Sequence, residues 1–112
     1  MGLDQRAGYD AVEVYDWRKH SRLQEFMGAI FSERVPNKEF NMQKLYLAKE
    51  DILTLQELIT NDNLPFSEGG FFWGHQFQEE SMKEYKKQDL KFCKDALKWI
   101  KEGKDVWYDC WY

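Results

Sequence analysis

Residues 17–22 carry the side chains of this sequence that are best suited to chemistry. Arg18, Lys19 and Arg22 are cationic, and His20 can exchange a proton near neutral pH. If the segment opens a helix, the free N–H groups of the first turn add positive potential there. Arg18 and Arg22 would then lie one turn apart and could hold a phosphate or carboxylate as a fork. The alternative is an internal acidic partner, because cations are unfavourable at the start of a helix.

A second unusual stretch, residues 67–77, combines three glycines, four aromatic rings and a histidine. It is too rich in glycine for a helix and too aromatic for a solvated linker, so we expect backbone that runs close to another strand or to a ligand. Its glycine spacing fits neither GxGxxG nor GxxxxGK[ST], which argues against a nucleotide loop. The ligand-binding candidates here are Gly69, Gly70, Trp73 and His75.

The histidine and cysteine spacing predicts no metal site and no cofactor. The chain has two histidines, no HxH or HExxH pattern and no CxxC pattern. Cys93 and Cys110 stand alone, and we expect both to be reduced thiols in a cytoplasm. No run of residues is long enough to span a membrane, and the N-terminus lacks the apolar core of a signal peptide. No Ser/His/Asp set has local support, so catalysis is not expected.

Residue patterns predict the elements that must position these side chains. Residues 1–11 have a weak structural signal. The expected elements are a strand at 12–15, a helix at 17–34 capped by Asp16, a strand at 44–47, a helix at 49–60, a helix at 79–102 and a strand at 105–112. The 112 residues are enough for one domain. We therefore predict a single small α+β domain, in which three helices pack on a short, mainly antiparallel sheet.

Asp89 falls between Tyr85 and Phe92, close to the apolar face of the expected third helix. A buried carboxylate needs a charged or hydrogen-bonding partner, and the cations and histidine of residues 18–20 are available. We interpret such a pair as structural rather than catalytic.

A row of lysines follows the opposite face of the same helix. Its members recur every three or four residues and are Lys83, Lys87, Lys91, Lys94, Lys98 and Lys101. A solvated face is the simplest interpretation, and an anionic partner such as nucleic acid is the alternative. The net charge of −4 argues against general nucleic-acid binding.

The last strand carries large rings on both faces. Trp107 and Trp111 point one way, whereas Tyr108 and Tyr112 point the other. Aromatic residues make up 17% of the chain, and rings in excess of what a core needs tend to mark interfaces. The strand is therefore either covered on both faces or meets a partner on one. The interaction candidates are Phe72, Trp107, Trp111 and Tyr112.

Several stretches taken together are distinctive: the opening Met1-Gly2-Leu3-Asp4, residues 17–24, residues 69–74, residues 85–92 and the ending Trp111-Tyr112. With these the chain resembles, over most of its length, a family of short proteins from bacteriophages, cyanophages especially, and from some bacteria. The resemblance implies an accessory protein in the cytoplasm of an infected host. It also implies that residues 17–22 and 69–75 belong to one site or one core. It implies no activity, since the family has no secure function.

Two hypotheses of function follow. The first is a non-catalytic protein-interaction module, whose partner is a host or viral protein or a second copy of the chain. The second is a binding protein or enzyme for a small anionic ligand. In that case Arg18, Lys19 and Arg22 hold the anion, while His20 and His75 exchange protons and Trp73 stacks on the ligand.

Overall fold

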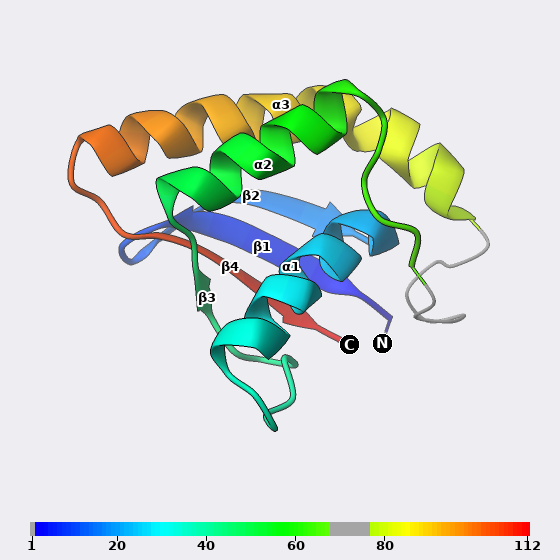
Figure 1. Cartoon of the computed structure of the whole chain (residues 1–112), viewed down its shortest axis with the longest axis horizontal. Helices are drawn as coiled ribbons and strands as arrows, with labels where there is room; N and C mark the ends of the chain where they lie inside the picture. Colours follow the sequence, from blue (N-terminus) through cyan, green and yellow to red (C-terminus); the bar gives the residue numbers. More distant parts are fainter. Residues whose placement is uncertain (1, 68–76) are drawn as a thin grey trace.

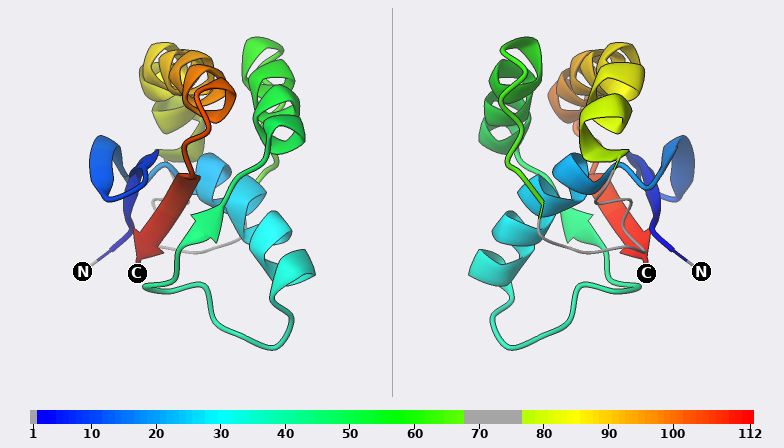
Figure 2. Two further views of the ribbon diagram at one scale, coloured as in Figure 1. Left: turned by 90° about the vertical axis from the view of Figure 1, so that its left-hand side faces the viewer. Right: turned by 90° about the vertical axis from the view of Figure 1, so that its right-hand side faces the viewer.

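The computed structural model, which describes residues 2–67 and 77–112, contains an antiparallel sheet with three helices on one of its faces (Figures 1 and 2). The strands are β1 (Asp4–Tyr9), β2 (Val12–Arg18), β3 (Leu45–Tyr46) and β4 (Val106–Trp111), and they are arranged in the order β2-β1-β4-β3. The helices are α1 (Ser21–Arg34), α2 (Lys49–Thr60) and α3 (Gln78–Lys101). All three strand pairings are antiparallel. The predicted α+β class is confirmed.

The first two strands form a hairpin, which corrects two expectations. Residues 1–11 do not lack structure, because β1 pairs with β2 on one side and with β4 on the other. The second strand does not end at Tyr15 but continues to Arg18, since Trp17 pairs with Gln5 in the ladder. A bulge interrupts the pairing at Gly8, where an added Cβ would lie 1.9 Å from the Val12 carbonyl oxygen. Only glycine fits the backbone at that approach.

The first helix begins at Ser21, four residues later than the sequence predicts. Lys19 takes a left-handed backbone conformation with φ of 55°, and its N–H donates to the Leu3 carbonyl at 2.8 Å. The chain therefore turns out of the sheet at Lys19, and His20 is the N-cap residue. The sequence predicts Asp16 as the cap of this helix, and that prediction is wrong, because Asp16 lies within β2.

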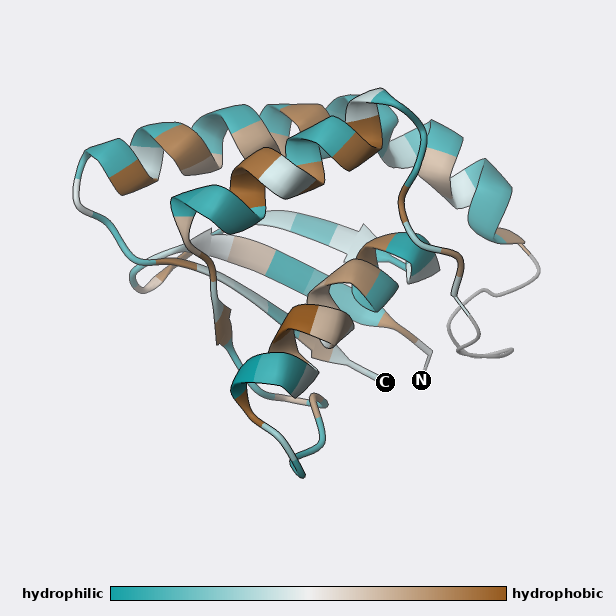
Figure 3. Ribbon diagram, in the orientation of Figure 1, coloured by the Kyte–Doolittle hydropathy of each residue, from teal (hydrophilic) through white to brown (hydrophobic). Residues whose placement is uncertain are grey.

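The other two helices lie where the sequence places them. Helix α2 has the predicted bounds, and the Asp51 carboxylate accepts a hydrogen bond from the Ala48 N–H at 2.8 Å ahead of its first turn. Helix α3 starts and ends one residue earlier than predicted. Beyond its end, Gly103 has a φ of 83°, and the N–H groups of Gly103 and Lys104 return to the last turn as in a Schellman motif. Apolar residues recur along α2 and α3 with the turn of each helix (Figure 3).

The core lies between the helices and the covered face of the sheet. Val106, Tyr108 and Cys110 of β4 point into it, and all three are at most 1% exposed. Phe92 of α3 meets Trp17 of β2 edge to face, with ring centroids 5.5 Å apart. Since β4 pairs with both β1 and β3, it is an inner strand of the sheet. The intervening residues of β4 are Trp107, Asp109 and Trp111, and they lie on the outer face of the sheet. None of the three described helices covers this face (Figure 2).

Candidate functional site

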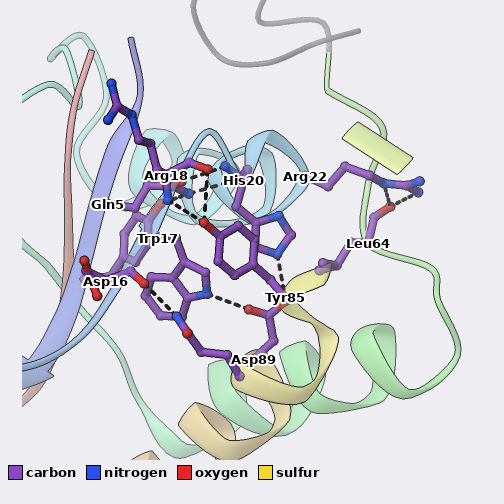
Figure 4. A network of polar contacts seen from close by, with 11 residues as sticks. Gln5, Asp16, Trp17, Arg18, His20, Arg22, Leu64, Tyr85 and Asp89 are labelled. Atoms are coloured by element: carbon purple, nitrogen blue, oxygen red, sulfur yellow. Dashed lines mark hydrogen bonds and ion pairs between the residues drawn. The ribbon is translucent and has the colours of Figure 1, made fainter. Parts of the chain in front are cut away.

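The centre of the site is a buried pair between His20 and Asp89, which joins the start of α1 to the middle of α3 (Figure 4). Nε2 of His20 lies 2.7 Å from Oδ2 of Asp89, and the Trp17 indole N–H donates to Oδ1 at 2.7 Å. The side chains of His20 and Asp89 are 0% and 1% exposed. The predicted partner for Asp89 is therefore confirmed to be His20, rather than Arg18 or Lys19.

Two further residues hold the His20 ring and its backbone. Tyr85 stacks on the imidazole with centroids 5.2 Å apart and an interplanar angle of 21°. Its hydroxyl also accepts a hydrogen bond from the Arg18 N–H at 3.1 Å, so α3 satisfies part of the free edge of β2. The Gln5 amide accepts from the His20 N–H at 2.9 Å and donates to the His20 carbonyl at 3.0 Å. The imidazole is thereby fixed in position and orientation.

The polar network continues through the core on the far side of Gln5. The side-chain amide of Gln5 donates to the Tyr108 hydroxyl at 2.8 Å. That hydroxyl donates in turn to the side-chain oxygen of Gln24 at 2.6 Å. The Gln24 amide donates to Sγ of Cys110 at 3.2 Å. Burial raises the pKa of the Tyr108 hydroxyl well above its usual value, and burial raises the pKa of the Cys110 thiol to about 12. Both groups therefore stay protonated at neutral pH.

Two buried polar atoms of the described residues, Nδ1 of His20 and Oγ of Ser21, have no hydrogen-bond partner. An ionised Asp89 can only accept hydrogen bonds, so Nε2 of His20 carries the hydrogen in that pair. In a neutral imidazole Nδ1 then presents a lone pair. A carboxylate that orients an imidazole in this way is the arrangement that prepares a histidine as a proton acceptor.

The three cations of the predicted anion site do not lie together. Arg18 lies on β2, its side chain is 71% exposed, and its nearest acid is Asp4 at 3.8 Å. Arg22 lies on α1, is 12% exposed and bonds to Glu79 at 2.7 Å and to the Leu64 carbonyl. Lys19 is half-buried in the turn between them. The side chains of Arg18 and Arg22 point in different directions, because residues 17–19 are not helical (Figure 4). The expected Arg18–Arg22 fork is therefore not formed, and internal acids partner the two arginines instead.

The remaining ligand candidates, Gly69, Gly70, Trp73 and His75, lie outside the described residues, as does the interaction candidate Phe72. The expectation that residues 69–75 share a site with residues 17–22 stays a prediction.

The outer face of the sheet is the second candidate surface. Trp111 of β4 is 41% exposed, and the guanidinium of Arg6 lies 4.4 Å above its ring. Asp109, which lies on β4 like Trp111, accepts two hydrogen bonds of 3.0 Å from the Arg6 guanidinium. Two hollows adjoin Trp111. One, of about 370 Å³, runs across β1 and β2, and the other, of about 350 Å³, lies between Gly2 and Tyr112.

The structure separates the three interaction candidates that it describes. Trp107 is 3% exposed, its indole N–H donates to the Asp10 carbonyl at 2.9 Å, and the Lys44 ammonium covers its ring. Tyr112 is 37% exposed and follows Trp111 at the end of β4. Trp107 therefore belongs to the fold, whereas Trp111 and Tyr112 reach the surface.

Sequence reasoning missed Gln5, Gln24, Arg6 and Asp109. The two glutamines are buried, and nothing in the local pattern marks a glutamine as a core residue. Arg6 and Asp109 face each other across β1 and β4, a pairing that depends on the register of two distant segments. Asp109 lies between Trp107 and Trp111 on alternate positions of the strand, and this was the available signal for the outer face.

No described helix is long and apolar enough to cross a membrane. The described residues also hold no group of three or more His, Cys, Asp or Glu side chains placed to bind a metal ion. Comparisons of the chain with protein-family models, with curated proteins and with solved structures found no match.

Proposed function

We propose that this protein is a non-catalytic interaction module that binds a partner protein on the outer face of its sheet. The observation that carries the proposal is Trp111, which stands exposed between two hollows with Arg6 stacked on it. The few residues that supply most of the binding energy in protein interfaces are enriched in tryptophan, tyrosine and arginine. A ring beside open hollows gives a partner both an anchor and space for its own side chains.

The rigidity of this surface favours binding. Asp109 is 6% exposed and holds the Arg6 guanidinium through two hydrogen bonds, so Arg6 and Trp111 are already ordered. Binding then loses little side-chain freedom, which leaves more of the contact energy for affinity. Following the resemblance to phage proteins, we place the partner among host or viral proteins in the host cytoplasm.

The test compares Trp111→Ala with Val12→Ala in affinity purification from host lysate, followed by binding assays with the purified partner. Val12 is a matched control, because it is 44% exposed and lies at the other end of the β1–β2 hairpin. We expect Trp111→Ala to weaken the interaction about 30-fold, the effect of losing an anchor residue, and Val12→Ala to leave it unchanged. The proposal is wrong if Trp111→Ala retains every interaction of the wild-type protein. A homodimer that dissociates on this substitution would identify a second copy of the chain as the partner.

The second candidate function is a site for a small anionic ligand close to His20. The lone pair of His20 Nδ1, the unpartnered hydroxyl of Ser21 and the nearly buried guanidinium of Arg22 favour it. A thermal-shift screen with nucleotides, sugar phosphates and organic acids tests it. A ligand at a hundred times its dissociation constant adds about 2.7 kcal/mol to the free energy of unfolding. Stabilisation that is lost in Arg22→Gln and kept in Arg18→Gln would support this site, and no stabilisation by any anion would eliminate it.

A further inference from the structure

A groove runs between α2 and α3 on the part of the helical layer that faces away from the sheet. Its volume is about 450 Å³, and it is lined by Lys49 and Leu53 of α2 and by Leu97, Ile100 and Lys101 of α3. Helical spacing places Leu97 almost opposite the residues of α3 that contact the strands. The groove has an apolar floor, and each of the two helices contributes one lysine to its lining.

A row of exposed lysines without ion-pair partners borders this groove. The six lysines of the predicted stripe are all exposed, and within the described part of the chain none has an acidic group within 4.0 Å. By contrast, Lys86 on the same helix pairs with Asp62 at 3.1 Å. Between Lys87 and Lys101, the two acids of α3 do not neutralise the row, whereas Glu80 and Glu84 are exposed near its Lys83 end. Asp89 is buried beside His20, and Asp95 accepts a hydrogen bond from Tyr15.

The row is continuous with the groove. At 1.5 Å per residue, the lysines from 83 to 101 extend over about 27 Å of helix. Lys101 belongs to both features, because it ends the row and lines the groove. On the helical wheel Lys94 lies about 60° from Leu97, on the side away from the sheet-facing residues. A local positive surface of this length is notable on a chain whose net charge is −4.

We propose that the groove and the lysine row together bind an acidic, amphipathic helical segment of a partner protein. The apolar side chains of the segment would enter the groove, and its carboxylates would face the lysines. The row contains no arginine and no aromatic residue for reading or stacking on bases, and a nucleic acid would leave the apolar floor unfilled. The apolar floor is recessed between two helices, where a narrow side chain fits and a flat bilayer surface does not.

This surface is separate from the one around Trp111, because one lies on the helical layer and the other on the outer face of the sheet. The two proposals therefore fail independently. A protein with both surfaces could hold two partners at once.

Fluorescence anisotropy with defined probes tests the proposal on the full-length chain. The main probe is a labelled helical peptide of about 18 residues, long enough to follow the row, with leucine on one face and glutamate on the other. The competing probes are single-stranded and duplex DNA, and vesicles that contain phosphatidylserine. The variants are Lys94→Gln/Lys98→Gln with Lys94→Arg/Lys98→Arg as its control, and Leu53→Ala with the exposed neighbour Thr54→Ala as its control.

We expect the peptide to bind, and Lys94→Gln/Lys98→Gln to weaken binding about fivefold, as the loss of two exposed ion pairs predicts. The arginine variant should retain binding, because it retains the charge. Leu53→Ala should weaken binding several-fold, whereas Thr54→Ala should not. Binding should also decrease as salt is raised, because the contacts are solvent-exposed. Tighter binding to DNA or to vesicles, the absence of binding to any probe, or peptide binding that is insensitive to both tested substitutions would each overturn the proposal.

Discussion

The pair between His20 and Asp89 predicts a large loss of stability on replacing Asp89 with alanine. The substitution leaves two buried donors without an acceptor, the indole N–H of Trp17 and Nε2–H of His20. An unsatisfied buried donor costs about 1–3 kcal/mol, so two of them cost about 2–6 kcal/mol. We take about 4 kcal/mol as the expected decrease in the free energy of unfolding.

This loss converts into a large change in melting temperature. The entropy of unfolding is about 2.1 cal/mol/K per residue, or about 0.24 kcal/mol/K for the 112 residues of this chain. A loss of 4 kcal/mol therefore lowers Tm by about 17 °C. Asp89→Asn should lower it by about half as much, because the amide oxygen can still accept from Trp17 while the amide nitrogen faces His20. Differential scanning calorimetry, with far-UV circular dichroism to confirm folding, measures both changes.

Glu84→Ala is the matched control, because Glu84 is an exposed acid on the same helix. Its Tm should stay within about 2 °C of the wild-type value, as is usual for surface substitutions. If Asp89→Ala shifted Tm no more than Glu84→Ala does, the Asp89 carboxylate would not be holding these donors in the folded protein. The structural interpretation of the pair would then be wrong.

Three further outcomes are expected. Trp107→Ala should lower the free energy of unfolding by about 3 kcal/mol, because it leaves a cavity at a buried site, whereas Trp111→Ala should change it by less than about 1 kcal/mol. Equal effects of the two substitutions in urea titrations would contradict the conclusion that only Trp107 belongs to the fold. Gly8→Ala should cost about 3 kcal/mol or unfold the hairpin, because its Cβ would meet backbone, and hydrogen exchange that leaves the β1–β2 amides protected would argue against this. Burial raises the pKa of the Cys93 and Cys110 thiols from about 9.0 to about 12, so the folded protein holds more protons than the unfolded chain in that interval. These pKa shifts should not affect the free energy of unfolding below pH 9, and this free energy should fall as the pH rises from 9 to 12. Iodoacetamide at pH 8 should label the two cysteines in urea but not in the native protein. Rapid labelling of the native protein would show that the two thiols are not buried.

Local patterns were sufficient for the parts of the chain where one face of an element repeats. The bounds of α2 and α3 follow from apolar residues at helical spacing and from a glycine that ends α3. The start of α1 was predicted wrongly, because Leu23 and Phe26 continue a helical pattern that residues 17–19 do not join. Tyr15 and Trp17 point into the core from alternate positions of a strand, and that alternation was the signal for a longer β2.

The class of fold, the position of Asp89 on an apolar helix face and the exposure of the lysine row could be predicted from the amino-acid sequence, because each depends on spacing within elements. Which residues meet depends on how the elements are arranged in space. The tertiary structure paired Asp89 with His20 across 69 residues and Arg6 with Asp109 across 103, and it separated Arg18 from Arg22. The physical reason is that sheet register and the turn at Lys19 set these distances. Neither depends on the residues near each side chain alone.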